Sequence, residues 1–204
     1  MTDHAIPLRE QDADADPLGQ FAAWFADAGA AGVREPEAMA IASATPAGAP
    51  SVRMVLCKAF DERGFVFFTN YESRKGRELT ANPRAALLFH WDPLGRQVRI
   101  EGPVERVGAG ETAAYARSRA RGSQLSALAS PQSRTVSGRE ELERSVAELE
   151  ARYAETEVPV PENWGGFRVV AETFEFWQQR SDRLHDRLVY RRVEGAWAIE
   201  RLAP

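Results

Sequence analysis

Short apolar runs separated by turn-like sequences dominate this chain and limit the folds that are open to it. Glycine and proline cluster between the runs, as in Pro46-Ala47-Gly48-Ala49-Pro50, and Glu194-Gly195 forms the last of these turns. Apolar runs bounded by such turns are typical of β-strands. Many strands joined mostly by short turns predict a closed or nearly closed β-barrel, beginning with a meander of three strands. The runs cover residues 38–45, 51–60, 64–70, 84–91, 96–107, 166–178, 187–193 and 197–202.

Helical patterns are inserted between these strands. Apolar residues recur at helical spacing after Pro17, which predicts a first helix that stops around residues 29–32. Ser73 is a good N-cap for a short helix through Leu79, and helices are also expected at residues 110–120 and 138–156. Strict strand–helix alternation and a Gly-x-Gly-x-x-Gly loop are both missing, which argues against a Rossmann nucleotide site. The predicted fold class is mainly β with inserted helices (α+β).

The bulk properties indicate one globular domain. A chain of 204 residues, of which 44% are hydrophobic and 27% charged, is large enough to bury a core. The first 16 residues are polar and acidic, so we predict a mobile N-terminal arm at 1–16 and a single domain at 17–204. A net charge of −4 argues against general nucleic-acid binding.

Cysteine, histidine and hydropathy patterns exclude further classes. The single cysteine, Cys57, rules out an intramolecular disulfide, and with three scattered histidines it makes a metal site improbable. No apolar run approaches the ~20 residues of a membrane span, so no membrane partner is expected. The N-terminus lacks the layout of a secretory signal, and we expect a cytoplasmic protein.

The stretch from Glu175 to Arg187 is rich in residues that bind ligands. It holds Phe176, Trp177, three arginines and His185 within 13 positions. Arginine offers planar, permanently charged forks for phosphate, histidine titrates near neutrality, and tryptophan offers a flat face for an aromatic ring. The stretch therefore predicts a pocket for a flat, anionic, ring-containing ligand.

Two further patterns suit phosphate groups. Thr69 to Lys75 runs from a strand end into a helix start, where free amide groups and two adjacent cations form an anion receptor. Tyr115, Arg119 and Ser123 are spaced four apart, which places them on one helical face if the helix persists. An ordinary amphipathic surface explains this second pattern equally well. Arg53 and Lys58, five apart in one strand, would by themselves be read as solvated charges.

The E-F-W-Q-x4-R-L-H-D-R pattern closely resembles the C-terminal motif of pyridoxine/pyridoxamine 5'-phosphate oxidases. Other blocks resemble that family in the same order, and together they span roughly residues 17–204. These blocks are Arg53–Lys58, Thr69-Asn70 with Ser73–Lys75, Arg96–Val98, Gln132-Ser133, Trp164–Arg168 and Trp197–Pro204.

The resemblance implies a split β-barrel of the FMN-binding type and a homodimer with FMN at the subunit interface. Arg183 and His185 alternate in sequence, so in a strand they would project to the same side. The resemblance implies that they act catalytically over the substrate pyridine ring. The implied FMN contacts are Arg53, Met54, Val55, Leu56, Cys57, Lys58, Phe68, Thr69, Arg74, Lys75, Gln97, Gln132, Ser133, Trp177 and Arg187. The implied substrate contacts are Lys58, Tyr115, Arg119, Ser123, Arg183, Leu184 and His185.

The activity implied by the resemblance is the FMN-dependent oxidation of pyridoxine 5'-phosphate and pyridoxamine 5'-phosphate to pyridoxal 5'-phosphate. Molecular oxygen would be the acceptor and hydrogen peroxide a product. One alternative is an FMN oxidase of the same fold with another substrate, for instance of the phenazine type, and the phosphate-binding set argues against it. The other is a non-catalytic protein that binds flavin or pyridoxal phosphate, against which Arg183 and His185 argue.

The chain also departs from the family pattern. Phe68 stands where the family often has tyrosine, so a hydroxyl contact is lost there, and Cys57 replaces an aliphatic residue as a small core side chain. Many members carry a basic, tyrosine-containing N-terminal stretch that folds over the active site. Here the arm before Pro17 is short and acidic, with Arg9 and no tyrosine, so we expect those lid contacts to be missing.

Overall fold

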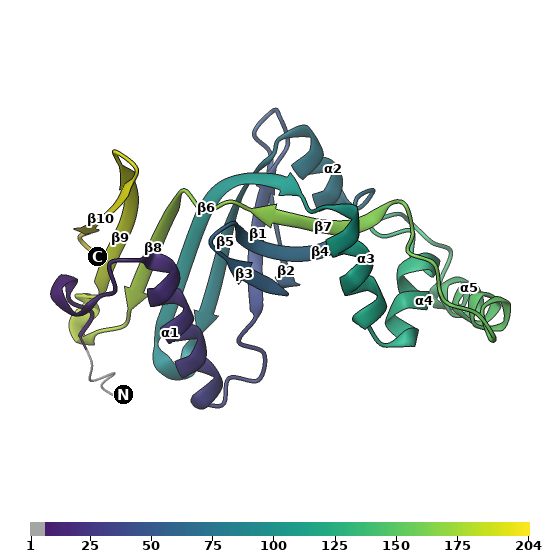
Figure 1. Cartoon of the computed structure of the whole chain (residues 1–204), viewed down its shortest axis with the longest axis horizontal. Helices are drawn as coiled ribbons and strands as arrows, with labels where there is room; N and C mark the ends of the chain where they lie inside the picture. The colour runs from purple at the N-terminus through teal and green to yellow at the C-terminus, as the bar shows by residue number, and fades with distance from the viewer. Residues whose placement is uncertain (1–6) are drawn as a thin grey trace.

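The computed structural model describes residues 7–204, and they form an antiparallel sheet of ten strands with helices around it (Figure 1). Along the main path the strand order is β10-β9-β8-β6-β5-β1-β2, while β3, β4 and β7 form a second group in which β4 pairs with β3 and β7. The strands are β1 (Ala38–Ala44), β2 (Pro50–Leu56), β3 (Ala59–Asp61), β4 (Gly64–Asn70), β5 (Arg84–Trp91), β6 (Arg96–Arg106), β7 (Trp164–Val169), β8 (Thr173–Gln178), β9 (Asp186–Val193) and β10 (Ala196–Arg201).

Two helices begin where the capping residues predict. Pro17 occupies the first turn of its helix, and the Asp16 side chain accepts a hydrogen bond from the Leu18 amide. Ser73 caps the next helix by accepting from the amide of Gly76 at 3.2 Å. Within residues 7–204 no helix is long and apolar enough to cross a membrane. The helices are α1 (Pro17–Ala30), α2 (Arg74–Ala81), α3 (Ala109–Ser118), α4 (Arg121–Ala129) and α5 (Arg139–Arg152), with short 3-10 turns η1 (Glu10–Asp12), η2 (Asp92–Leu94) and η3 (Ser181–Arg183).

Strand β6 joins the two groups of strands. Its first half, Arg96–Glu101, pairs with β8, and its end, Val104–Arg106, pairs with β7. Gly102 lies at the change of partner, where an added Cβ would come within 1.8 Å of the Val170 carbonyl oxygen. Because only glycine allows this close approach, Gly102 lets one long strand serve both groups.

An aromatic core fills the space between the sheet and α1. Phe21 is fully buried, and its ring meets those of Phe60, Phe65 and Phe89 edge-on, each at a centroid distance of 4.9 Å. Edge-to-face pairs of this kind contribute about 1 kcal/mol each beyond the area they bury. The first helix is therefore an integral part of the fold.

The structure corrects several expected boundaries. The apolar run 51–60 is split into β2 and β3, and the run 166–178 into β7 and β8, which pair with different strands. The expected meander of three strands is confirmed in its two antiparallel pairings, β1 with β2 and β3 with β4, but its middle strand is divided, because β2 and β3 belong to different groups of strands. Helix α4 was not expected at all. Apolar periodicity reports burial, and it does not report the bend of a strand or its partner.

Part of the predicted arm lies against the C-terminal strands. The Leu8 side chain is buried, its amide donates to Asp186 Oδ2 at 3.2 Å, and Arg201 Nε donates to Glu10 Oε1 at 2.8 Å. The Tyr190 hydroxyl donates to the Asp14 carbonyl oxygen at 2.8 Å. These contacts count against free motion of residues 7–16, and residues 1–6 lie outside the described part. The division of the chain at residue 16 stays a prediction.

Candidate functional site

A cavity of about 310 Å³ lies between the end of β4, the start of α2 and the end of α3. We call it the cation cavity, because three of its lining side chains are basic. It brings together ten of the predicted site residues, from segments far apart in the sequence. Its lining consists of Met54, Val55, Leu56, Lys58, Phe68, Thr69, Lys75, Tyr115, Arg119, Gln132 and Trp164.

Lys75 is held at the cavity wall by two neutral groups. Its Nζ donates to Thr69 Oγ1 at 2.9 Å and to Gln132 Oε1 at 3.0 Å, and the Thr69 hydroxyl donates to the same amide oxygen at 3.0 Å. Burial lowers the pKa of Lys75 below its ordinary value, and the nearby charge of Arg53 lowers it further. Because both effects disfavour the charged ammonium group, a bound anion would stabilise it.

Arg119 is a second basic residue in the lining of the cation cavity. Its Cζ lies 4.8 Å from the centroid of the Trp164 ring, and the structure gives its guanidinium no hydrogen bond or ion pair with residues 7–204. Burial lowers its pKa from the ordinary value, and burial also raises the pKa of the neighbouring Tyr115 hydroxyl. A half-buried guanidinium with free donors is suited to a phosphate monoester.

The helical argument for this set was wrong in one respect. Helix α3 ends at Ser118, and Arg119 continues in extended backbone at φ −73° and ψ 149°. Arg119 and Tyr115 nevertheless both line the cation cavity. Ser123 lies in α4, is exposed and does not line the cavity, because the break between the helices turns it away from the shared face.

Arg53 and Arg74 meet at a buried carboxylate beside the cation cavity instead of lining it. Arg53 Nη2 donates to Glu78 Oε2 at 3.2 Å, and Arg74 Nε donates to Glu78 Oε1 at 2.9 Å. The hydroxyls of Ser43 and Ser51 also donate to Glu78. Burial raises the pKa of Glu78, but these hydrogen bonds outweigh it and hold the value at about 2.

A second cavity, of about 270 Å³, gathers the C-terminal candidates. We call it the tryptophan cavity, because the Trp177 ring lies beside that of His185 at a centroid distance of 4.6 Å. The amide of Arg180 donates to His185 Nδ1 at 3.1 Å, which leaves Nε2 of the ring as the other polar position. Its lining consists of Gln97, Arg99, Glu175, Trp177, His185, Arg187 and Pro204.

Glu175 links two arginines of this cavity. Its carboxylate accepts a hydrogen bond from Arg187 Nε at 2.9 Å and another from Arg99 Nη2. Burial raises the pKa of Glu175, and the bonds from Arg187 and Arg99 outweigh that effect and lower it. The carboxylate therefore remains charged and holds Arg187 in place. Because Arg187 Nη1 also donates to the Ala203 carbonyl oxygen at 2.8 Å, Nη2 is the nitrogen that is left to serve a ligand.

Arg183 and Leu184 stand outside both cavities. Arg183 ends a turn in which it and Asp182 have φ values of 60° and 55°, a region that residues other than glycine rarely adopt, and Leu184 follows this turn. Arg183 is exposed, and Leu184 is 71% exposed. The expectation that Arg183 and His185 alternate along a strand is wrong, because Arg183 lies in η3 and β9 begins only at Asp186.

Two other predicted contacts also lie off the cavity linings. Cys57 is buried, its Sγ donates to the Ala59 carbonyl oxygen at 3.3 Å, and burial raises its pKa to about 12. A thiol in that state is a poor nucleophile. Ser133 is exposed, with a φ of 68°, next to the cavity residue Gln132.

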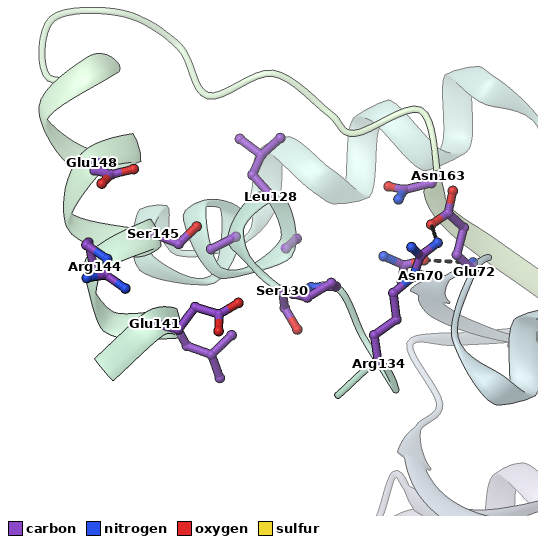
Figure 2. A pocket seen from close by; sticks show the side chains of 14 residues that line it. Asn70, Glu72, Leu128, Ser130, Arg134, Glu141, Arg144, Ser145, Glu148 and Asn163 are labelled. Carbon is purple, nitrogen blue, oxygen red and sulfur yellow. Dashed lines mark hydrogen bonds and ion pairs between the residues drawn. The ribbon is translucent and has the colours of Figure 1, made fainter. Parts of the chain in front are cut away.

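A third cavity, of about 440 Å³, contains none of the predicted site residues. It lies between α4, α5 and the loop before α2 (Figure 2). Arg134 Nη2 pairs with Glu72 Oε2 at 2.8 Å across it, and Asn70 Oδ1 accepts the Glu72 amide at 2.7 Å. Arg134 and Glu72 are thus already paired with each other, and the volume of this cavity alone does not identify the place of the chemistry.

The cation and tryptophan cavities share no residue. Figure 1 shows β9 and β10 at one end of the long axis of the molecule and α3 and α4 towards the other. One chain therefore carries two partial sites that face different regions of its surface.

Sequence reasoning missed several residues of these sites. Trp164 and Glu175 belong to blocks that carry the family resemblance, and that membership was the available signal. Arg99 and Glu78 carry no such signal. Their importance depends on ion pairs with residues 76 and 25 positions away.

Comparison with known proteins agrees with this geometry. Residues 25–153 match the family model described as pyridoxamine 5'-phosphate oxidase, and residues 164–204 match that of the pyridoxine 5'-phosphate oxidase C-terminal dimerisation region. The chain is 56% identical over 197 residues to the pyridoxine/pyridoxamine 5'-phosphate oxidase of Rubrobacter xylanophilus, covering 97% of this chain and 91% of that one. It is 55% identical to the enzyme of the same name from Gluconobacter oxydans, covering 98% of each.

Solved structures confirm the predicted fold. PhzG from Burkholderia lata, in complex with tetrahydrophenazine-1-carboxylic acid, superposes with a TM-score of 0.92 at 35% identity, covering 98% of both chains. A pyridoxamine 5'-phosphate oxidase-related, FMN-binding protein from Nostoc punctiforme has a TM-score of 0.73 at 15% identity, covering 94% of this chain and all of that one. The split barrel, the ordered sequence blocks and the identity over nearly the whole chain together mean that this protein belongs to the pyridoxine/pyridoxamine 5'-phosphate oxidase family.

Proposed function

We propose that this protein oxidises pyridoxine 5'-phosphate and pyridoxamine 5'-phosphate to pyridoxal 5'-phosphate, with FMN as cofactor and oxygen as acceptor. Relatives that carry this enzyme's name are 52–57% identical to the chain across almost its full length. Identity at this level, together with family models that match residues 25–153 and 164–204, supports the same reaction here.

The observation that carries the proposal is the set of cations around the cation cavity. Arg119 has no anionic partner among residues 7–204, and burial disfavours the charged forms of both Lys75 and Arg119. Both groups would be stabilised by a bound phosphate. FMN and the substrates each carry one phosphate, and the cavity offers three basic side chains to these anions, those of Lys58, Lys75 and Arg119.

The residues present fit FMN. Lys75, Thr69 and Gln132 supply donors and acceptors on one wall, and Met54, Val55 and Leu56 supply main chain and apolar surface on another. Arg74 lies at the N-terminus of α2, where free amide groups add to its charge. Bound FMN would accept a hydride equivalent from the substrate carbon beside the pyridine ring and pass the electrons to oxygen, giving hydrogen peroxide.

The side chains of the protein would bind and orient the substrate. Lys58, Tyr115 and Arg119 would hold its phosphate in the cation cavity. Arg183 would lie over the pyridine ring as an electrostatic contact, and His185 would hydrogen-bond a ring substituent. The exposure of Arg183 and its left-handed backbone support a role in binding, because strained, exposed segments cluster at ligand sites.

We infer that the complete site forms between two subunits of a homodimer. The matched dimerisation region, residues 164–204, supplies most of the tryptophan cavity, including Trp177, His185 and Arg187. Because the cation and tryptophan cavities are separate in one chain, FMN would lie between the cation cavity of one subunit and the tryptophan cavity of the other. A two-fold interface would create two such sites.

The similarity to PhzG supports one alternative, an FMN oxidase for a phenazine-type substrate. That protein is 35% identical to this chain, against 52–57% for the pyridoxine/pyridoxamine 5'-phosphate oxidases. The ligand of that protein is a carboxylic acid, which offers an anion to a guanidinium as a phosphate does, so the higher identity decides between the two substrate classes. We therefore favour the phosphorylated pyridines.

Anaerobic spectrophotometry tests the proposal directly. Pyridoxine 5'-phosphate should bleach the visible flavin band of the purified protein, and oxygen should restore it. A yellow protein that bleaches only with another reductant would exclude these substrates and favour the alternative. A colourless protein that does not take up added FMN would contradict the whole proposal.

A further inference from the structure

Trp164 lines the cation cavity, and none of the roles described so far belongs to it. It is the first residue of β7, and it is 8% exposed. Its ring is nearly parallel to that of Phe68, at 17° and a centroid distance of 5.5 Å. The indole is therefore fixed by packing and still faces the cavity.

Strand pairing explains why these two rings meet. In the β4–β7 ladder Phe68 lies opposite Gly166 and Asn70 lies opposite Trp164, so Phe68 and Trp164 are diagonal neighbours on one face. A Cβ on Gly166 would come within 2.9 Å of Phe68 Cε1. Glycine at this position lets the Phe68 ring lie flat against β7.

A third ring extends the arrangement into the cavity. Tyr115 stacks on Phe68 at a centroid distance of 3.9 Å and an angle of 21°, and its ring is within 8° of parallel to Trp164. We call Trp164, Phe68 and Tyr115 the aromatic stack. Because Tyr115 is part of it, the stack also places a hydroxyl group at the cavity wall.

Arg119 depends on this stack for its orientation. Gln124 Nε2 donates to the Arg119 carbonyl oxygen at 2.7 Å, which holds the backbone. Its guanidinium has no hydrogen bond or ion pair to residues 7–204, and its Cζ lies 4.8 Å from the Trp164 ring centroid. The indole face is therefore the described contact that directs this charge, and all five N–H donors remain available to a ligand.

We propose that Trp164 is a positioning residue, whose indole holds the Arg119 guanidinium at the cavity wall and thereby sets the selectivity for phosphorylated over unphosphorylated pyridine substrates. The inference rests on the proposed function. Trp164 acts on the substrate through Arg119, so its removal should weaken binding of the phosphate group and leave the reacting carbon in place.

Trp164→Leu and Trp164→Phe test the role against a matched control. Trp197→Leu removes another indole with an arginine over it, since Arg192 Cζ lies 4.4 Å from that ring in β10. We expect Trp164→Leu to raise KM for pyridoxine 5'-phosphate and Kd for pyridoxal 5'-phosphate roughly tenfold, while kcat changes less than about twofold. Trp164→Phe should recover much of the loss, and Trp197→Leu should change neither constant.

Two outcomes would overturn the inference. One is an equal loss for phosphorylated and unphosphorylated ligands in Trp164→Leu, which would indicate general damage to packing. The other is additivity in a double-mutant cycle: if Trp164 acts through Arg119, Trp164→Leu should have no further effect in an Arg119→Ala background. A wild-type protein that binds pyridoxal 5'-phosphate but oxidises neither substrate would contradict the proposed function alone, because the binding measurements would still test Trp164.

Discussion

The carboxylate of Glu78, whose side chain is 6% exposed, accepts a hydrogen bond from Nη2 of Arg53 at 3.2 Å. The other terminal nitrogen of Arg53 donates to Ser43 Oγ at 2.7 Å and to the Ile41 carbonyl oxygen at 3.3 Å. Most N–H donors of this guanidinium are therefore committed inside the protein. Arg53 contributes mainly its positive charge to the cation cavity, where burial and, to a lesser extent, this charge lower the pKa of Lys75.

Replacing Glu78 with glutamine should destabilise the protein by about 2 kcal/mol at neutral pH, because hydrogen bonds to a buried charge are lost. The pKa of Glu78 is about 2 in the folded protein, against an ordinary value of 4.5. A lowered pKa gives stability that is fully present above 4.5 and is lost as the pH falls towards 2. Urea unfolding at several pH values should therefore show the difference from wild type shrinking over that interval.

Glu143→Gln is the control for this measurement. Glu143 pairs with Arg139 on the surface of α5, where its side chain is 60% exposed. An exposed pair of this kind contributes well under 1 kcal/mol, so the variant should unfold like the wild type. An equal loss of stability in both variants would contradict the special position of Glu78.

Arg183→Ala should lower kcat by roughly 10²-fold and leave the affinity for FMN nearly unchanged, because Arg183 is proposed to contact the substrate ring. Steady-state kinetics and FMN titration measure the two effects separately. Arg191→Ala removes an exposed arginine paired with Glu200 and should have normal kinetics. Near-normal turnover in Arg183→Ala would refute the catalytic role.

Mixed dimers should reveal whether two subunits share each site. Arg119→Ala damages the cation cavity and Arg187→Ala damages the tryptophan cavity, so each variant alone should be nearly inactive. Dissociating and reassociating an equal mixture should restore about a quarter of the wild-type sites, since half of the dimers are mixed and each of those has one intact site. No recovery in verified mixed dimers would mean that each site belongs to one chain.

Lys75→Met should weaken FMN binding at least about tenfold, because it removes a buried charge that faces the proposed phosphate. Burial and Arg53 lower the pKa of Lys75, so wild-type FMN affinity should fall as the pH rises through that lowered value. Titration of flavin fluorescence between neutral and alkaline pH measures this dependence, which should be absent in Lys75→Met. Riboflavin, which lacks the phosphate, should bind both proteins alike; a matching loss of riboflavin affinity would contradict a phosphate contact.

Local sequence features were sufficient for the element types and for several of their ends. Pro17 and Ser73 begin helices at the predicted residues, because capping depends on a few neighbouring side chains. The turn at Glu194-Gly195 forms as expected, with both residues at positive φ. The ordered blocks also indicated the family, which the comparisons confirm.

The site was only partly visible in the sequence. The blocks named most of the residues that line the cation and tryptophan cavities, but helical spacing put Ser123 beside Arg119, and strand alternation put Arg183 beside His185. Both inferences failed at short breaks in regular structure, after Ser118 and before Asp186. A break of one or two residues changes the direction of every side chain that follows it.

The sequence by itself therefore determined the starts of α1 and α2, several turns and the family of this protein. Only the tertiary structure decided that β6 joins two groups of strands at Gly102, that Glu78 links Arg53 to Arg74, and that the candidate residues divide into two separate cavities. The physical reason is the distance along the sequence between the residues that interact. Caps and turns are set by neighbours within a few positions, whereas strand partners and buried ion pairs are chosen by contacts between residues far apart in the chain.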